Sequence, residues 1–406
     1  MKRLLKLITI IIIIVILFVT FSGIYGIQSV DDLAYAVALG IDVGDQNNLK
    51  VTFQFTRPNS SGENASGELA PTTTISVESS SIDAAIHLMN TYISKKINLA
   101  HCKAIIFSEE FAQKGIKREL NALMNKVEVR PDASLIISKC TAKEYISSVK
   151  PDLENLVAKY YEISPNSSDY TAYTSNIMIG KFYNKLNCTT CHPIAILGGI
   201  SSTLSHSTSS NSQKDEQAKA GESPLEVNNK AENIGLAVFK EDKLVGELNG
   251  IQTLCYSIVT NTLNNATISF SMNEDENNTI DLYLYKFKPN KIDVKIVNGS
   301  PYISISIGLK AKILSGETYS SELTEEGLER VSAATNLYLE KQILAYLYKT
   351  TKDFKSDVSG FGKYATPLFL TMQEWEDYNW LDNYVDSFFE VSVDTQIDSS
   401  FLLNNL

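Results

Sequence analysis

The chain has 406 residues, 44% of them hydrophobic and 20% charged, which is an ordinary composition for a globular protein with two or three domains. Its formal net charge is −11, and no Lys/Arg cluster forms a stripe outside the extreme N-terminus, so nucleic acid is not an expected partner. Eight carboxylates and no Lys or Arg follow Lys363. A solvated polar face explains this acidic stretch, and a patch for cations or for a partner is the alternative.

The N-terminal residues predict a membrane anchor. Three basic residues lie among the first six, and an uncharged run follows over residues 7–27. A helix of this length, at about 1.5 Å per residue, spans the hydrocarbon core of a bilayer. Because the positive residues precede the run, the N-terminus is expected in the cytoplasm and residues 28–406 outside it. A cleaved signal peptide is the rival interpretation, but small residues are poorly arranged for cleavage around Gly23 and Gly26, which favours an uncleaved transmembrane helix.

Between residues 28 and 200 the pattern alternates between strands and helices. Apolar or alternating runs predict strands over 33–43, 49–57, 102–107 and 133–138. Apolar residues at helical spacing predict a helix that begins after an N-cap at Ser80, and further helices over 111–125 and 141–149. Repeated strand–helix units predict a sheet with helices packed on it.

The second half begins after a change in composition. Residues 201–232 hold no aromatic residue and are rich in Ser, Thr, Asn, Lys, Glu and Ala, which predicts a disordered linker. Beyond it we expect a hairpin over 235–240 and 243–248, strands over 279–287, 291–297, 302–309 and 388–393, and a helix over 324–350. On that helix, Ala334, Leu337, Leu344 and Tyr348 are expected on one apolar face.

The predicted fold class is therefore mixed α/β (α+β), with two or three domains of mixed sheets and packed helices after an N-terminal transmembrane helix. The predicted organisation is an anchor or signal over 1–27, one or two α/β domains over 28–200, a disordered linker over 201–232 and a C-terminal α/β domain over 233–406.

The cysteines offer one candidate site. Five cysteines are an odd number, so the chain is not a disulfide-framework protein. Cys188, Cys191 and His192 match the C-x-x-C-H pattern of c-type haem attachment, in which two thioethers hold the haem and the His ligates iron. Pro193 follows directly and the surrounding sequence is rich in β-strand pattern, so a local disulfide or free thiols are favoured over a haem electron carrier. No second Cys/His pair stands at zinc-ligand spacing.

Motifs of catalysis are absent from the sequence. It contains no G-x-S-x-G elbow and no Walker A sequence, and His87 lies within a predicted helix. Residues 360–365 fit a loose G-x-G-x-x-A pattern but do not open a βαβ unit. We therefore expect neither an enzyme nor a cofactor, and the catalytic, cofactor and metal sites stay unassigned.

Several stretches of the chain together follow the pattern of one known family. In the first half they are 32–42 (DLAYAVALGID), 101–107 (HCKAIIF) with 109–116 (EEFAQKGI), 128–130 and 139–142. In the second half they are 237–246 (AVFKEDKLVG), 357–362 (DVSGFG) and Trp375. Together these stretches resemble the Ger(x)C spore germination proteins. One departure is that members are commonly lipoproteins with a cysteine before the first strand, whereas the first cysteine here is Cys102. Because this cysteine is missing, we expect the apolar N-terminal helix to anchor the chain.

The resemblance implies the C subunit of a nutrient-germinant receptor, exposed on the outer face of the spore inner membrane. It implies assembly with a membrane-embedded A subunit and a transporter-like B subunit, with the nutrient germinant sensed indirectly. A tethered extracytoplasmic solute-binding protein, with its ligand in an interdomain cleft, is the alternative.

A partner interface is expected within residues 98–130. This segment carries polar side chains at the two ends of a predicted strand: His101, Lys103, Glu109, Glu110 and Arg130. Ordinary solvated strand ends explain each of them equally well.

Overall fold

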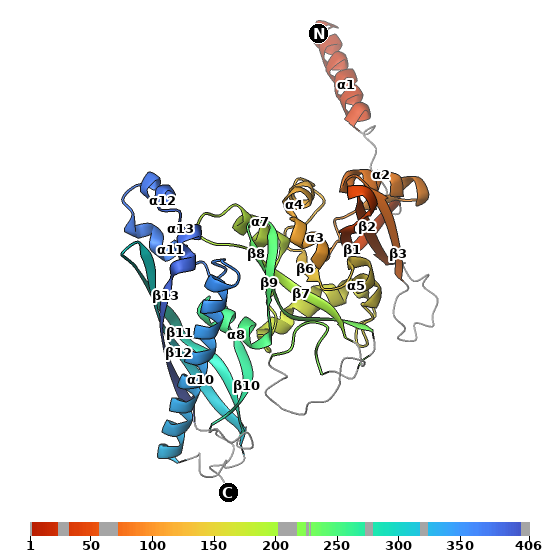
Figure 1. The fold of residues 1–406 in the computed structure, drawn as a ribbon. Helices are drawn as coiled ribbons and strands as arrows, with labels where there is room; N and C mark the ends of the chain where they lie inside the picture. The colour runs from red at the N-terminus through yellow and green to blue at the C-terminus, as the bar shows by residue number, and fades with distance from the viewer. Residues whose placement is uncertain are drawn as a thin grey trace.

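The computed structural model describes residues 2–22, 32–56, 72–201, 217–224, 227, 229–272, 279–316 and 324–398. Within these residues, nine strands form one sheet and four form a second, with helices packed on both (Figure 1). The predicted mixed α/β class is therefore confirmed.

The larger sheet is mixed and runs in the order β3-β2-β1-β5-β6-β7-β8-β9, with the short β4 paired to β1. Neighbours along β1, β5, β6 and β7 are parallel, and β2, β3, β8 and β9 join by antiparallel pairing. The strands are β1 (Leu33–Val43), β2 (Leu49–Thr56), β3 (Thr72–Ser79), β4 (Lys96–Asn98), β5 (Ala104–Ser108), β6 (Ser134–Ser138), β7 (Ile194–Ser201), β8 (Lys230–Lys240) and β9 (Lys243–Leu248).

Helices cover both faces of this sheet. One face packs against α2 (Ile82–Tyr92), α3 (Glu109–Lys114), α4 (Lys117–Met124) and α7 (Ile179–Leu186), and the other against α5 (Ala142–Ser148) and α6 (Val157–Ile163). Along β5, Ile105 and Phe107 pack into the hydrophobic core beneath α2, α3, α4 and α7, whereas Ala104 and Ile106 pack into the core beneath α5 and α6. A strand buried on both sides is apolar on both faces, which is why this strand could be identified from the apolar residues 104–107 within the predicted run over 102–107.

Two predicted boundaries needed correction. The N-cap of α2 is Ser81 rather than Ser80, because the Ser81 hydroxyl accepts a hydrogen bond from the Ala84 N–H at 3.1 Å. The helix predicted over 111–125 is two helices, since Gly115 between them has a φ of +113°, which glycine tolerates and which a helix does not allow.

The second sheet has the order β10-β11-β12-β13. Its strands are β10 (Asn265–Ser271), β11 (Thr279–Val297), β12 (Ser300–Gly316) and β13 (Phe388–Asp398). Asn298 and Gly299, both with positive φ, form the two-residue turn of the β11–β12 hairpin. β13 is parallel to β12, so the chain must cross over between them, and α10 (Glu325–Lys352) lies in that crossover (Figure 1).

The buried face of α10 differs from the predicted one. Leu337 is 70% exposed, whereas Val331, Leu339, Ile343 and Leu347 are buried. These residues pack against β13 and α8 (Gly250–Val259) and belong to the same hydrophobic core as α5 and α6. The two sheets therefore share a continuous core.

Side chains of α10 also cover the free edge of β13. The Val393 N–H donates to Glu340 Oε1 at 2.9 Å, the Thr395 N–H donates to Asn336 Oδ1 at 2.9 Å, and the Ser332 hydroxyl donates to the Thr395 carbonyl at 2.6 Å. The three side chains are four residues apart, which puts them on one face of the helix. An edge covered in this way is not free to pair with another strand.

Short helical segments complete the fold. They are η2 (Asp45–Asn47), η3 (Ser164–Asp169), α11 (Gly362–Ala365), η6 (Thr366–Leu368), α12 (Met372–Tyr378), α13 (Trp380–Asn383) and η7 (Tyr384–Asp386).

Parts of the segment predicted as a linker are packed against the larger sheet. Ser201 ends β7 and Lys230 begins β8, and the two residues are paired. Between them, Ala220 is fully buried and its N–H donates to the Ile234 carbonyl at 2.9 Å. Low-complexity composition did not indicate this packing; residues 202–216, 225, 226 and 228 lie outside the described residues. Strand β8 also crosses the boundary that was predicted between the linker and the C-terminal domain, at residues 232 and 233.

The N-terminal helix α1 (Lys2–Ser22) stands away from the body (Figure 1). Its apolar side chains that are described are exposed: Leu5, Leu7, Ile8, Ile10, Ile11, Ile12, Ile13, Ile14, Val15 and Ile16. Over the described part of the chain, no helix has the length and hydropathy needed to span a membrane.

Candidate functional site

Three of the five predicted interface residues gather at the amino ends of β5 and β6. His101 is exposed and its ring packs edge-to-face on Tyr35, with 4.5 Å between ring centroids. Lys103 Nζ lies 3.8 Å from Glu162 Oε2. Arg130 donates from Nε and Nη2 to both carboxylate oxygens of Asp132 at 2.9 and 2.6 Å.

We call His101, Lys103, Arg130, Asp132 and Glu162 the amino-end patch. The Arg130 hydrogen bonds lower the pKa of Asp132, so its charge persists well below neutral pH. Lys103 is 26% exposed and its partner Glu162, like Arg130 and Asp132, is about half exposed, so solvent screens both pairs and they contribute little to folding stability. Charges of this kind influence the encounter and orientation of a partner more than the fold.

Glu109 and Glu110 lie at the opposite end of β5. Glu110 is exposed and pairs with Lys114 at 2.9 Å within α3. Glu109 is half-buried, and burial together with the charge of Glu247 raises its pKa. The structure therefore separates these two residues from the amino-end patch and does not combine all five into one surface.

Glu109 lies beside an ion-pair network that the sequence did not reveal. Lys139 Nζ lies 2.9 Å from Glu222 Oε1 and 3.6 Å from Glu247 Oε2, and Lys219 Nζ lies 3.0 Å from the same Glu247 oxygen. Burial opposes the charge on Lys139, but the Glu222 hydrogen bond and the Glu247 charge raise its pKa. The network ties the segment around Lys219 to β9 and to the end of β6, which is a structural role.

A buried carboxylate holds the helix that follows β6. Asp42 near the end of β1 accepts hydrogen bonds from the Ala142 and Lys143 N–H groups at 2.7 and 3.1 Å, at the start of α5. Burial raises the pKa of Asp42, and these two bonds oppose the increase. Asp42, which the family resemblance included, therefore positions α5.

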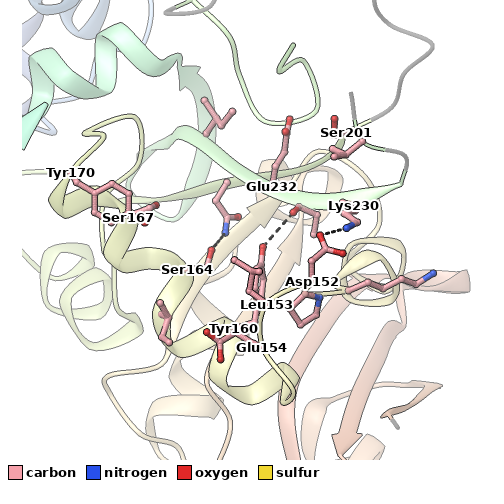
Figure 2. A pocket seen from close by; sticks show the side chains of 17 residues that line it. Asp152, Leu153, Glu154, Tyr160, Ser164, Ser167, Tyr170, Ser201, Lys230 and Glu232 are labelled. Carbon is pink, nitrogen blue, oxygen red and sulfur yellow. Dashed lines mark hydrogen bonds and ion pairs between the residues drawn. The ribbon is translucent and has the colours of Figure 1, made fainter. Parts of the chain in front are cut away.

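A cavity of about 550 Å³ lies beside the start of β8 (Figure 2). The segment before α6, the α6–η3 helices and β8 form its walls. Figure 2 shows Lys230 paired with Asp152. Asn233 Nδ2 donates to the Ser164 hydroxyl at 3.3 Å. Tyr160 donates its hydroxyl proton to the Ala231 carbonyl at 3.3 Å. The lining thus mixes apolar surface with polar groups that are paired with one another, while the buried Ser201 hydroxyl has no hydrogen-bond partner among the described residues.

The Cys188–His192 segment forms part of a joint between the two halves of the chain. The His192 N–H donates to the Asp357 carbonyl at 2.8 Å, and Trp375 Nε1 donates to the Thr189 hydroxyl at 3.3 Å. A Cβ at Gly362 would lie 2.5 Å from the Thr190 carbonyl oxygen, so glycine is required for this close contact. We call residues 188–192 and 357–380 the joint.

Asp357 is the polar centre of the joint. It is fully buried and accepts hydrogen bonds from the Gly360 and Gly362 N–H groups at 2.7 and 3.0 Å, and from Trp380 Nε1 at 2.9 Å. Burial raises its pKa, although all three donors favour the carboxylate. The residues 357–362 that carry the family resemblance therefore build a loop that packs on the first half.

The haem interpretation gains no support from this geometry. Cys191 is 9% exposed and His192 is 3% exposed, and both lie beneath the loop that Asp357 organises. A haem bonded to both cysteines and ligated by His192 would have to displace that loop and its tryptophans. All five cysteines are free thiols, and no cluster of three or more metal-binding side chains occurs among the described residues.

The fold and its surfaces define a mixed α/β protein whose candidate sites are charged patches, one cavity and one buried joint. The chain belongs to the Ger(x)C family of spore germination proteins. Residues 26–197 match the family described as Spore germination protein N-terminal domain, and residues 234–400 match the family described as Spore germination B3/GerAC like, C-terminal. The predicted resemblance is therefore confirmed.

Similar proteins agree with this assignment. The chain is 22% identical to Spore germination protein KC of Bacillus subtilis (strain 168), over 93% of this chain and 92% of the relative. It is also 22% identical to Spore germination protein B3 of the same organism, over 94% and 93% of the two chains. The crystal structure of the GerBC protein has the same fold, with a TM-score of 0.54 and 17% identity over 88% of this chain and 96% of that one.

Proposed function

We propose that this chain is the C subunit of a spore nutrient-germinant receptor and works without a reaction centre, through surfaces that it offers to A and B subunits. The observation that carries the proposal is the family match, which extends over both halves of the chain. Relatives that align over nearly their whole length are named spore germination proteins.

The proposed location is the outer face of the spore inner membrane. The uncharged segment over residues 7–27 follows three basic residues, which favours a cytoplasmic N-terminus and export of the rest. The exposed apolar side chains of α1 make water an unfavourable environment for that helix. Holding the chain there would keep its α/β body close to membrane-embedded partners.

The amino-end patch is the proposed partner surface. β1, β5 and β6 are parallel, so their amino ends lie at the same edge of the sheet. The chain reaches β1 at this edge from α1, and the ten intervening residues can span at most about 35 Å. The patch therefore lies on the side of the body from which the proposed anchor arrives.

A triple substitution tests this surface. Replacing His101, Lys103 and Arg130 together by Ala should strongly slow nutrient-triggered germination and leave the circular dichroism and melting temperature of the protein nearly unchanged. The matched control replaces Lys295 and Lys341, which are exposed in the second half, and should germinate normally. Normal germination of the folded triple variant would contradict the assignment of the patch, and loss of its fold would make these residues structural.

Solute binding is a second candidate function, favoured by the cavity in Figure 2. Its volume of about 550 Å³ lies within the range of small-molecule sites. Calorimetry of the full chain with candidate amino acids separates the two functions. A scaffold that acts only through contacts should give no binding heat, whereas a solute-binding protein should give a saturable one.

A further inference from the structure

We propose that Cys188 and Cys191 form a redox-active dithiol, whose reversible disulfide is sensed by the joint between the two halves of the chain. The pair lies on the loop between α7 and β7, and the receptor function proposed above makes no use of it. This inference stands on the geometry of the loop and does not rest on that function.

The two thiols differ in exposure. Cys188 is half-buried and accessible, and Cys191 is 9% exposed. Cys188 Sγ lies 2.9 Å from the Thr190 hydroxyl oxygen and accepts a hydrogen bond from the Thr190 N–H at 3.4 Å. A further hydrogen bond joins the Cys188 and Cys191 side chains. Donors directed at one sulfur of a C-x-x-C pair stabilise the thiolate that attacks disulfides.

The pKa values of the two thiols differ as well: that of the accessible Cys188 is lowered and that of the buried Cys191 is raised. Burial opposes ionisation of Cys188, but the hydrogen bonds from Thr190 and Cys191 outweigh it and lower the pKa of Cys188. Burial raises the pKa of Cys191 to about 12. Burial also raises the pKa of Cys102 to about 12 and raises that of Cys140, so neither of these cysteines shares the lowered pKa of Cys188. Cys188 is thus suited to be the attacking thiol and Cys191 the resolving thiol.

The reaction is a thiol–disulfide exchange with an external disulfide as oxidant. The Cys188 thiolate attacks one sulfur of that disulfide, forming a mixed disulfide and releasing the first oxidant thiolate. Cys191 then loses its proton and attacks the Cys188 sulfur, which forms the Cys188–Cys191 bond and releases the second oxidant thiolate. The protein loses two protons and two electrons, and the oxidant disulfide becomes two thiols.

Contacts of the intervening residues connect this reaction to the joint. Thr189 accepts from Trp375, and the Thr190 carbonyl lies against Gly362. Closing the disulfide fixes the distance between the two cysteine Cβ atoms at about 3.8 Å and removes the Cys188 thiol from its bonds with Thr190. We expect the backbone of Thr189 and Thr190 to adjust when the disulfide closes, and the tryptophan side of the joint to adjust with it.

The chain carries its own reporter of that change. It has two tryptophans, Trp375 and Trp380, and both belong to the joint. Their emission should therefore differ between the oxidised and the reduced protein.

The test equilibrates the purified full chain in mixtures of oxidised and reduced glutathione, followed by alkylation with iodoacetamide and trypsin digestion. Both cysteines fall on the tryptic peptide 186–214. After oxidation, neither cysteine of this peptide should be alkylated, because both are held in the disulfide. Reduction with dithiothreitol before alkylation should make both cysteines reactive again, and tryptophan emission should change in parallel. Cys140→Ser should keep this response and Cys188→Ser should abolish it.

Three results would overturn the proposal. The first is a peptide 186–214 that stays doubly alkylated in oxidised glutathione. The second is a stable glutathione adduct on Cys188 that does not proceed to Cys191. The third is a disulfide that forms without any change in tryptophan emission. All three are read on the wild-type chain, so they hold even where the Cys188→Ser variant fails to fold.

Discussion

The burial of His192 makes stability depend on pH in a way that can be calculated. Burial lowers its pKa from the ordinary 6.5 to about 4, with the charge of Lys240 contributing in the same direction and that of Asp382 opposing it. The unfolded chain binds a proton near pH 6.5 and the folded chain only near pH 4. Stability is therefore fully present above pH 6.5 and is lost as pH falls toward 4. At pH 5 the loss amounts to about 2 kcal/mol.

Urea unfolding followed by tryptophan emission measures this loss. The wild-type chain should lose about 2 kcal/mol relative to a His192→Gln variant between pH 7 and pH 5. Comparing the two proteins cancels the contributions that other titratable groups make to the pH dependence of stability. Burial raises the pKa of Asp357, so the contribution of Asp357 to stability falls as pH rises, but Asp357 is present in both proteins. Unfolding free energies that stay parallel for the two proteins from pH 7 to 5 would refute the burial of His192.

Three further variants test the joint and the covered edge. Asp357→Ala leaves three buried donors without an acceptor and should cost about 3–5 kcal/mol by urea unfolding, and a loss below about 1 kcal/mol would contradict the role of this carboxylate. Gly362→Ala forces the joint apart at Thr190 and should cost about 2 kcal/mol; an unchanged melting temperature would argue against the close contact. Replacing Asn336 and Glu340 by Ala frees two N–H groups of β13, which should cost about 2 kcal/mol and cause concentration-dependent association visible by light scattering, whereas a monodisperse variant of normal stability would show that the edge needs no cover.

Local pattern predicted the elements of the larger sheet well. The runs that became β1, β5 and β6 are apolar because both faces of each strand are buried, and that signal is visible in sequence. The segment over 201–232 was less informative. Ala220 is fully buried there through contacts with distant residues, which composition does not encode. On α10, Leu337 fits an apolar face but is exposed, because packing on β13 and α8 selects another face.

The candidate sites depend on contacts between residues far apart in the chain. The ends of β5 could be located from sequence, so the separation of His101 and Lys103 from Glu109 follows from strand length. The pairing of Asp357 with the segment around His192 could not be derived, since it brings the two halves of the chain together. Two glycines within five residues after Asp357 were the signal for a tight loop.

Photo-crosslinking can detect contact between the amino-end patch and another receptor subunit. A photo-reactive amino acid is placed at position 103 of the full chain in spores, and the adducts extracted from spore membranes are identified by mass spectrometry. The control places it at position 337, where Leu337 is exposed on α10. We expect adducts with a membrane-embedded A or B subunit from position 103 and few from position 337. Adducts that are absent at position 103, or equally frequent at both positions, would contradict it.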